Sequence, residues 1–147
     1  MKRLSVSAAL RRRVQERAFG NCEYCLLSEA DAYFSHEPDH IIACKHGGTT
    51  EFENLCWSCF DCNRFKGSDI ASRDPRDDQL VPLFNPRTDR WHDHFKLQDT
   101  AIISGATPSA RATEKLLKFN IDSRIEVRMT LVGLNRYPGP LPPAASS

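Results

Sequence analysis

Apolar residues near the N-terminus recur with the spacing of one helix face. Four of them lie at every fourth position, namely Val6, Leu10, Val14 and Ala18. Ser5 or Ser7 can cap such a helix, and Gly20 can end it. The pattern predicts a helix that docks by its apolar side and leaves its basic side chains on other faces.

A second helical region is expected near the C-terminus. Thr107 and Pro108 have the pattern of an N-cap followed by a first-turn proline. In the helix that follows, one face is formed by Ala112, Leu116 and Phe119. Another helix is predicted from Asp122, with three apolar residues directed inward, Ile125, Met129 and Val132.

The pattern between these helices predicts short strands and turns. Short β segments fit near Ala32–Phe34 and Asp39–Cys44, and Gly47-Gly48 centres a turn-rich loop at Lys45–Thr50. Asp61 stands where a helix cap is expected. A hairpin is predicted from two segments that flank a polar break, Phe95–Leu97 and Ala101–Ser104.

The remaining segments read as connections. Residues 68–90 are dense in Asp, Arg and Pro and predict a long surface connection. Residues 138–147 contain four prolines and predict a disordered tail. We therefore expect a single α+β domain over residues 1–137, with residues 68–137 as a supporting extension.

Composition is that of an ordinary globular protein, because 40% of the 147 residues are hydrophobic and 27% are charged. The net charge is only +1, so a nucleic-acid partner must be argued from where the charges lie. Residues 1–20 carry six basic residues against the single acid Glu16, namely Lys2, Arg3, Arg11, Arg12, Arg13 and Arg17. Arg11, Arg12 and Arg13 are candidate phosphate contacts, with a solvated helix side as the alternative.

The sequence predicts a soluble, cytoplasmic protein with no membrane partner. The apolar run after Met1-Lys2-Arg3 is broken by Ser5 and Ser7, unlike that of a signal peptide. No apolar window approaches the roughly 20 residues needed to cross a bilayer. Since cytosolic thiols are kept reduced, the six cysteines indicate metal binding rather than disulfides.

Two cysteine pairs have the spacing of zinc knuckles. Cys22 and Cys25 form the first pair, and Cys59 and Cys62 form the second. Cys56 and Cys59 have the same internal spacing, so the spacing alone leaves the second pair open. Four thiolates suit a structural zinc ion that closes the 33 residues between the pairs into a fixed scaffold.

The segment closed by the cysteines carries the residue types that phosphodiester hydrolysis needs. His40 can act as a base near neutral pH. Asp39 and Asn63 offer oxygen ligands for a magnesium-like ion, which would stabilise charge on the phosphorane and on the leaving oxygen. Arg64 or Lys66 could hold neighbouring phosphates. Adjacent strand residues face opposite sides, so Asp39 and His40 converge only at a strand end or distortion.

Four stretches resemble the zinc-containing HNH endonucleases: "CEYC", "DHIIACKHGG", "ENL" and "CWSCFDCNRFKG". The resemblance covers roughly residues 19–67 and implies a ββα-metal motif. It implies that His40 is the general base, that Asn54 holds the strand of that histidine, and that Asp39 and Asn63 bind the catalytic divalent ion. It also implies that zinc is bound by the cysteines at 22, 25, 59 and 62, which resolves the second pair against Cys56.

The resulting expectation is a metal-dependent endonuclease that hydrolyses DNA, with structural Zn²⁺ and catalytic Mg²⁺, Mn²⁺ or Ni²⁺. Its scaffold would be a ββα motif stapled by a four-cysteine zinc site, with an N-terminal helix and a C-terminal hairpin plus helices. Two alternatives remain open. One is a non-catalytic zinc module that binds nucleic acid or protein, and the other is a nuclease that acts mainly on RNA.

Overall fold

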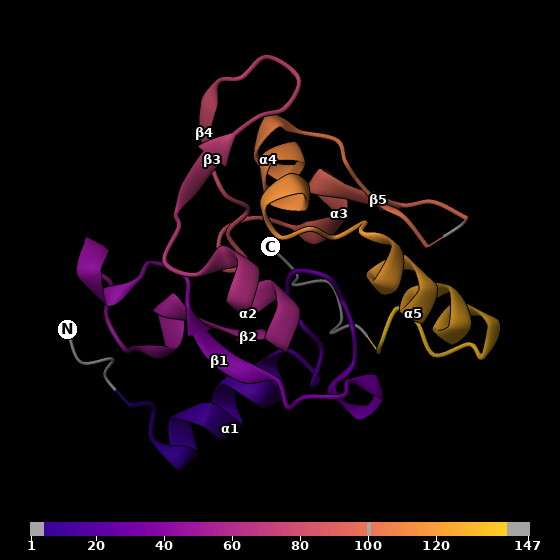
Figure 1. The fold of residues 1–147 in the computed structure, drawn as a ribbon. Coiled ribbons are helices and arrows are strands. Elements are labelled where there is room, and N and C mark those ends of the chain that lie inside the picture. Colours follow the sequence, from indigo (N-terminus) through magenta and orange to yellow (C-terminus); the bar gives the residue numbers. More distant parts are fainter. Residues whose placement is uncertain (1–4, 100, 141–147) are drawn as a thin grey trace.

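The computed structural model describes residues 5–99 and 101–140. In these residues short helices combine with three two-stranded antiparallel sheets, which confirms an α+β fold (Figure 1). The first sheet and the helix after it lie between the N-terminal helix on one side and the C-terminal elements on the other.

The N-terminal helix forms as its apolar spacing predicts. Helix α1 spans Ala8–Arg17, and the Ser7 hydroxyl caps it by accepting from the Leu10 N–H. Val14 and Ala18 are buried against Leu55 and Trp57. This apolar contact holds α1 on the first sheet.

A ββα unit follows and forms the centre of the molecule. Strands β1 (Glu37–His40) and β2 (Leu55–Ser58) pair antiparallel, and helix α2 (Phe60–Lys66) follows directly. The register places Asp39 opposite Cys56 and His40 opposite Leu55. The strand expected at Asp39–Cys44 is therefore shifted toward the N-terminus, so that His40 ends it.

Two local predictions in this region are wrong. The strand expected near Ala32–Phe34 does not form, because the Ser28 hydroxyl caps a 3-10 turn, η1 (Glu29–Asp31), whose residues precede a bend. The N-cap of helix α2 lies two residues before the expected Asp61, since the Cys59 sulfur accepts from the Cys62 N–H and takes the N-cap position.

The connection between β1 and β2 contains two further 3-10 turns. Turn η2 spans Cys44–His46 and ends at Gly47, which has the left-handed φ of 90°. Turn η3 spans Phe52–Asn54 and leads directly into β2. The prediction of a turn-rich loop built on Gly47-Gly48 is confirmed.

The C-terminal extension is built from two hairpins and three helices. Its elements are β3 (Ala71–Arg73), β4 (Leu80–Pro82), α3 (Trp91–His94), β5 (Phe95–Leu97), β6 (Ile103–Gly105), α4 (Pro108–Leu116) and α5 (Asp122–Gly133). The hairpin of β5 and β6 and the Thr107 cap of α4 are confirmed. Residues 68–90 are more than a surface connection, because they contain the β3–β4 hairpin and the buried Leu83 and Phe84.

Helix α5 begins at Asp122 as predicted but turns a different face inward. Met129 and Val132 are 51% and 41% exposed, whereas Arg124, Arg128 and Leu131 are buried. The two arginines turn inward because their guanidinium groups find sulfur and carbonyl acceptors in the interior.

The main hydrophobic core joins the ββα unit to the extension. The cysteines at 22, 25, 59 and 62 pack in the same cluster as Phe84, Phe95 and Phe119. Gly139 donates its N–H to the Leu26 carbonyl, so this part of the tail is held in place. The rest of the tail expected to be disordered, residues 141–147, lies outside the described residues.

Across residues 5–99 and 101–140, each helix is too short or too polar to pass through a bilayer.

Candidate active site and metal centre

Four cysteine sulfurs come together as the knuckle spacing predicts. The sulfurs of Cys22, Cys25, Cys59 and Cys62 all lie within 4.8 Å of one another, and all four residues are buried. A tetrahedral zinc ion with Zn–S bonds of about 2.3 Å separates its sulfurs by roughly 3.8 Å. The Cys25 and Cys59 sulfurs are 3.7 Å apart, so the set fits such an ion.

Local backbone geometry prepares each pair for a metal. The Cys25 N–H points at the Cys22 sulfur at 3.5 Å, and the Cys62 N–H points at the Cys59 sulfur at 3.4 Å. These N–H groups stabilise negative charge on the first cysteine of each pair.

Cys56 is excluded from this group by its place in β2. Its side chain is fully buried, and burial together with the nearby Asp39 charge raises the pKa of its thiol well above the usual range. A neutral buried thiol serves as a small apolar side chain. The ambiguity between the two possible second pairs is thereby resolved in favour of Cys59 and Cys62.

His40 lies at the end of β1, where the strand pairing stops. Its Nε2 is 2.9 Å from the Thr50 hydroxyl, which can accept from or donate to the ring. Its carbonyl accepts from the Lys66 ammonium at 3.1 Å. The imidazole is therefore held by the loop after β1, and its backbone is held by α2.

Asn54 ties the residues after His40 to the loop that precedes β2. Its side chain accepts from the Ile42 N–H at 3.0 Å and donates to the Ile42 and Thr49 carbonyls at 2.9 and 2.8 Å. Gly48 makes this contact possible, because a Cβ there would lie 1.6 Å from the Ile42 oxygen. The asparagine thus bridges back toward the histidine strand, the arrangement that the motif resemblance implies.

An open pocket of about 470 Å³ lies beside His40. Its lining includes His40 from β1, Asn63 from α2, and Arg11 from α1, with Glu37 next to them. The Arg11 guanidinium donates to the His36 carbonyl at 3.1 Å and to the Glu37 carboxylate at 3.4 Å. A base, an amide and a guanidinium therefore face one space that solvent can enter.

Asp39 lies apart from this lining, in the interior. It is only 3% exposed, and its carboxylate is 3.6 Å from the ammonium of Lys66, which is itself 2% exposed. Lys66 is therefore not a surface cation, and the expectation that it contacts phosphates is corrected. The cause is the last turn of α2, which directs Lys66 at the buried carboxylate rather than at solvent.

The oxygen ligands expected for a divalent ion lie on neighbouring elements, Asp39 on β1 and Asn63 on α2. The Lys66 ammonium shows that positive charge is accommodated at the Asp39 carboxylate. Asn63 is three residues before Lys66 on α2, so the two side chains share one side of the helix. A carboxylate and an amide oxygen are ligands that a magnesium-like ion accepts while it keeps several waters.

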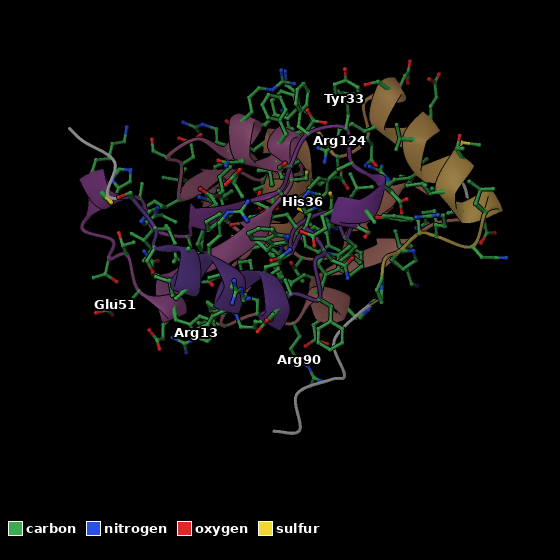
Figure 2. The ribbon with its side chains drawn as sticks, turned by 90° about the horizontal axis from the view of Figure 1, so that it is seen from below. Arg13, Tyr33, His36, Glu51, Arg90 and Arg124 are labelled. Carbon is green, nitrogen blue, oxygen red and sulfur yellow. The ribbon has the colours of Figure 1, made fainter. Side chains whose placement is uncertain are left out.

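The basic candidates for nucleic-acid contact are distributed around this site. Arg12 and Arg13 are exposed, and Arg13 lies at the rim of the molecule below α1 (Figure 2). Arg13 also places its guanidinium 4.1 Å from the Phe52 ring centre. Arg64 is exposed on α2 and lies over the Phe65 ring at 4.5 Å. Arg11 alone of these lines the His40 pocket.

Sequence reasoning did not identify three residues that the structure places at these centres. Thr50 contacts the His40 ring, Glu37 lines the pocket, and Arg124 reaches the cysteine sulfurs. The position of Thr50 two residues after the Gly47-Gly48 turn was a usable signal. No sequence signal marked Arg124, because a single arginine on a helix normally indicates a solvated face.

Comparison with known proteins identifies one family. Residues 22–69 match the family model described as HNH endonuclease, which covers the cysteine pairs and the segment between them. Searches of curated proteins and of solved structures found no match.

Proposed function

Residues 22–69 form an HNH endonuclease domain, and from that premise we propose that the protein hydrolyses phosphodiester bonds of DNA with His40 as the general base. The observation that carries the proposal is the pocket in which His40 and Asn63 face the same open space. The scissile phosphate would enter this pocket.

His40 has the position and the support that a general base needs. It lines the pocket beside Asn63 and is 5% exposed. Thr50 restricts the orientation of the imidazole, and Asn54 fixes the backbone directly after it. Histidine is the side chain that most often acts as a general base near neutral pH. Asn54 acts here as a positioning residue.

Asp39 and Asn63 are the residues that would hold a divalent ion. When bound, Mg²⁺ or a similar ion such as Mn²⁺ or Ni²⁺ supplies charge stabilisation for the phosphorane and the leaving oxygen. Asp39 must exchange its contact with Lys66 for this role.

Arg11 is the residue best placed to hold the substrate backbone at the site, because it lines the pocket. Arg12, Arg13 and Arg64 are exposed and would contact phosphates further along the strand. We propose that residues 1–137 act as one domain for this purpose, since α1 supplies Arg11 and the extension shares the core of the zinc segment.

The test is cleavage of supercoiled plasmid by the wild type and by His40→Ala, with Mg²⁺ or Mn²⁺ and with EDTA. We expect wild-type cleavage that needs the divalent ion, and a loss of at least about 100-fold in His40→Ala. Zinc content and the circular dichroism spectrum should be unchanged in the variant. His92→Ala is the matched control, because His92 is exposed on α3 and should leave cleavage intact. Undiminished cleavage by His40→Ala would refute the proposal.

One observation favours a second candidate, a non-catalytic zinc module that binds nucleic acid or protein. The carboxylate of Asp39, the proposed ion ligand, is already paired with the buried ammonium of Lys66. Such a module would bind DNA in a gel-shift assay but show no cleavage with any divalent ion. A panel of DNA and RNA substrates in the same assay distinguishes a nuclease that acts mainly on RNA.

A further inference from the structure

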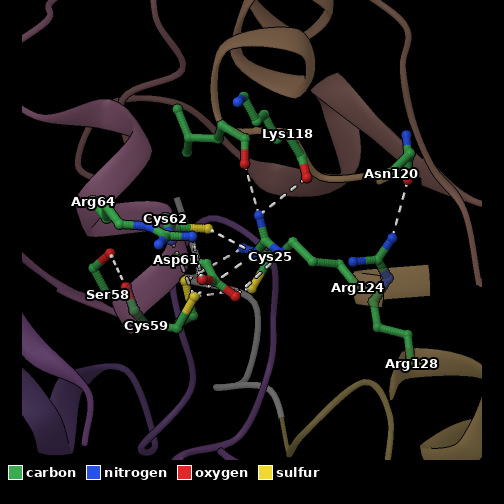
Figure 3. Close-up of polar contacts among 12 residues, drawn as sticks. Cys25, Ser58, Cys59, Asp61, Cys62, Arg64, Lys118, Asn120, Arg124 and Arg128 are labelled. Atoms are coloured by element: carbon green, nitrogen blue, oxygen red, sulfur yellow. Dashed lines mark hydrogen bonds and ion pairs between the residues drawn. The ribbon is translucent and has the colours of Figure 1, made fainter. Parts of the chain in front are cut away.

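Arg124 reaches from helix α5 into the cluster of cysteine sulfurs. Its guanidinium donates to the Cys62 sulfur at 3.2 Å and lies 3.8 Å from the Cys59 sulfur (Figure 3). A second branch donates to the Leu117 carbonyl at 2.7 Å. The side chain is 7% exposed, so it makes these contacts in an environment with little water.

The contact of Arg124 with the sulfurs would offset the negative charge of the metal-bound cysteine group. Four thiolates and one Zn²⁺ ion carry a net charge of about −2. The four cysteines are buried, and uncompensated charge is costly in such surroundings. The Arg124 cation halves that excess. It also gives the Cys62 sulfur a charge-assisted donor, and such hydrogen bonds are stronger than neutral ones.

Arg124 also stands between the sulfurs and solvent. A pocket of about 510 Å³ on this side of the molecule is lined by Cys25, Cys59 and Arg124. The guanidinium covers part of the path by which a chelator could approach the metal. Its carbonyl contact at Leu117 and its 3.9 Å ion pair with Asp61 hold it in that position.

We propose that Arg124 is a positioning residue of the zinc site, and that the C-terminal extension uses it to retain the metal. The residues that bind zinc all lie between positions 22 and 62, yet this partner arrives from helix α5, sixty-two residues beyond Cys62. The proposal assigns the extension a role and does not depend on nuclease activity.

Arg128 provides an internal comparison on the same helix. It is also buried, but its guanidinium donates to the Ala101 carbonyl at 2.8 Å and to the Asn120 side chain at 3.0 Å. Its substitution removes a buried cation and its hydrogen bonds from α5 and leaves the hydrogen bonds of Arg124 to sulfur in place. Effects common to both arginines are structural, and effects specific to Arg124 belong to the metal site.

The experiment compares the full chain with Arg124→Met, Arg124→Lys and Arg128→Met, each loaded with one zinc ion. Zinc release to the chromogenic chelator 4-(2-pyridylazo)resorcinol is followed at a temperature where circular dichroism shows every variant folded. We expect release about 10- to 100-fold faster in Arg124→Met, the range seen when partners of metal ligands are removed. Arg124→Lys should fall between it and the wild type, and Arg128→Met should stay within about 2-fold of the wild type.

Cobalt substitution gives a readout that a purely structural role would not move. The thiolate-to-Co²⁺ charge-transfer band should shift in Arg124→Met and keep its wild-type position in Arg128→Met, because only the first loses a hydrogen bond to sulfur. If Arg124→Met does not fold, Arg124→Lys decides by the same two measurements. Equal release rates and unshifted bands in both arginine variants would overturn the proposal.

Discussion

The zinc segment, residues 22–67, and the C-terminal extension, residues 68–137, stabilise their interiors by different means. The zinc segment buries four cysteines together with Asp39, His40 and Lys66. The extension buries aromatic and aliphatic side chains such as Phe84, Phe95 and Phe119. The interior of the zinc segment contains the four-cysteine group, which fits a zinc ion, and the buried Asp39–Lys66 ion pair, whereas most of the residues buried in the extension are apolar.

The zinc segment carries the proposed catalytic residues, whereas the extension contributes mainly apolar surface to the core. Polar groups in the zinc segment are held close to where the chemistry is proposed, and a zinc ion bound by the four cysteines would offset the small apolar area of that segment. The extension contributes apolar surface to the same core and sends Arg124 to the sulfurs. The two regions are therefore chemically distinct but share one interior.

The largest effect should follow from loss of a proposed zinc ligand. Cys62→Ser replaces a thiolate that helps to close the segment, so we expect zinc stoichiometry to fall from one per chain to near zero and the segment to unfold. Cys44→Ser is the control, because Cys44 lies outside the four-sulfur group and is partly exposed. Zinc analysis and circular dichroism measure both. Retention of tightly bound zinc by Cys62→Ser would contradict the assigned ligand set.

A large loss of cleavage is expected from Gly48→Ala without loss of zinc. The added Cβ would collide with the Ile42 carbonyl and displace the Asn54 side chain that bridges to it. A misplacement of about 1 Å at a catalytic centre costs on the order of 100-fold in rate. Gly133→Ala, where a Cβ meets nothing within 4 Å, should cleave at the wild-type rate. Full activity in Gly48→Ala would show that the Asn54 bridge does not position His40.

Because the two regions share one core, a core substitution in the extension should destabilise both regions together. Phe119→Ala should lower the free energy of unfolding by about 3–5 kcal/mol, because Phe119 is fully buried. Leu134→Ala should change it by less than about 0.5 kcal/mol, since Leu134 is 61% exposed. Urea denaturation in the presence of zinc, followed by both tryptophan fluorescence and circular dichroism, should give one transition. Two separate transitions would show that the regions unfold independently.

The smallest effect concerns two ion pairs within the extension. The buried Asp74 carboxylate binds the Arg111 guanidinium through two bonds of 2.9 and 2.7 Å, and this contact holds the pKa of Asp74 at about 2. Asp74→Asn should lower the thermal midpoint by a few degrees, because the bonds join the β3–β4 hairpin to α4. Asp78→Asn removes an exposed pair with Arg73 and should leave the midpoint unchanged. Equal midpoints in the two variants would contradict the structural role of the buried pair.

The sequence predicted those features that have local chemical signals. Cysteine spacing indicated the four-sulfur group, Thr107-Pro108 marked the start of a helix, and the apolar spacing of residues 6–18 indicated α1. His40 lies at the end of its strand, but Asp39 is buried and does not line the same pocket, so the expected convergence of the two side chains stays a prediction.

Features that depend on tertiary contacts could not be predicted in the same way. The inward face of α5 was predicted wrongly because the acceptors of Arg124 and Arg128 lie elsewhere in the chain. Lys66 looked like a phosphate contact at a helix end, but a buried carboxylate from β1 binds it instead. A pattern within one segment does not reveal a partner supplied by another.

The most direct test of the central claim measures metal content and cleavage on one sample. The claim is that the cysteine-bound zinc is structural and that a second, exchangeable ion serves the His40 pocket. The wild type is treated briefly with EDTA, and its zinc content and plasmid cleavage are measured before treatment, after it, and after addition of Mg²⁺. The account predicts that cleavage stops while zinc stays at one per chain, and that Mg²⁺ alone restores cleavage. Cleavage that persists in EDTA with zinc retained, or that is lost together with zinc and returns only when zinc is added, would contradict it.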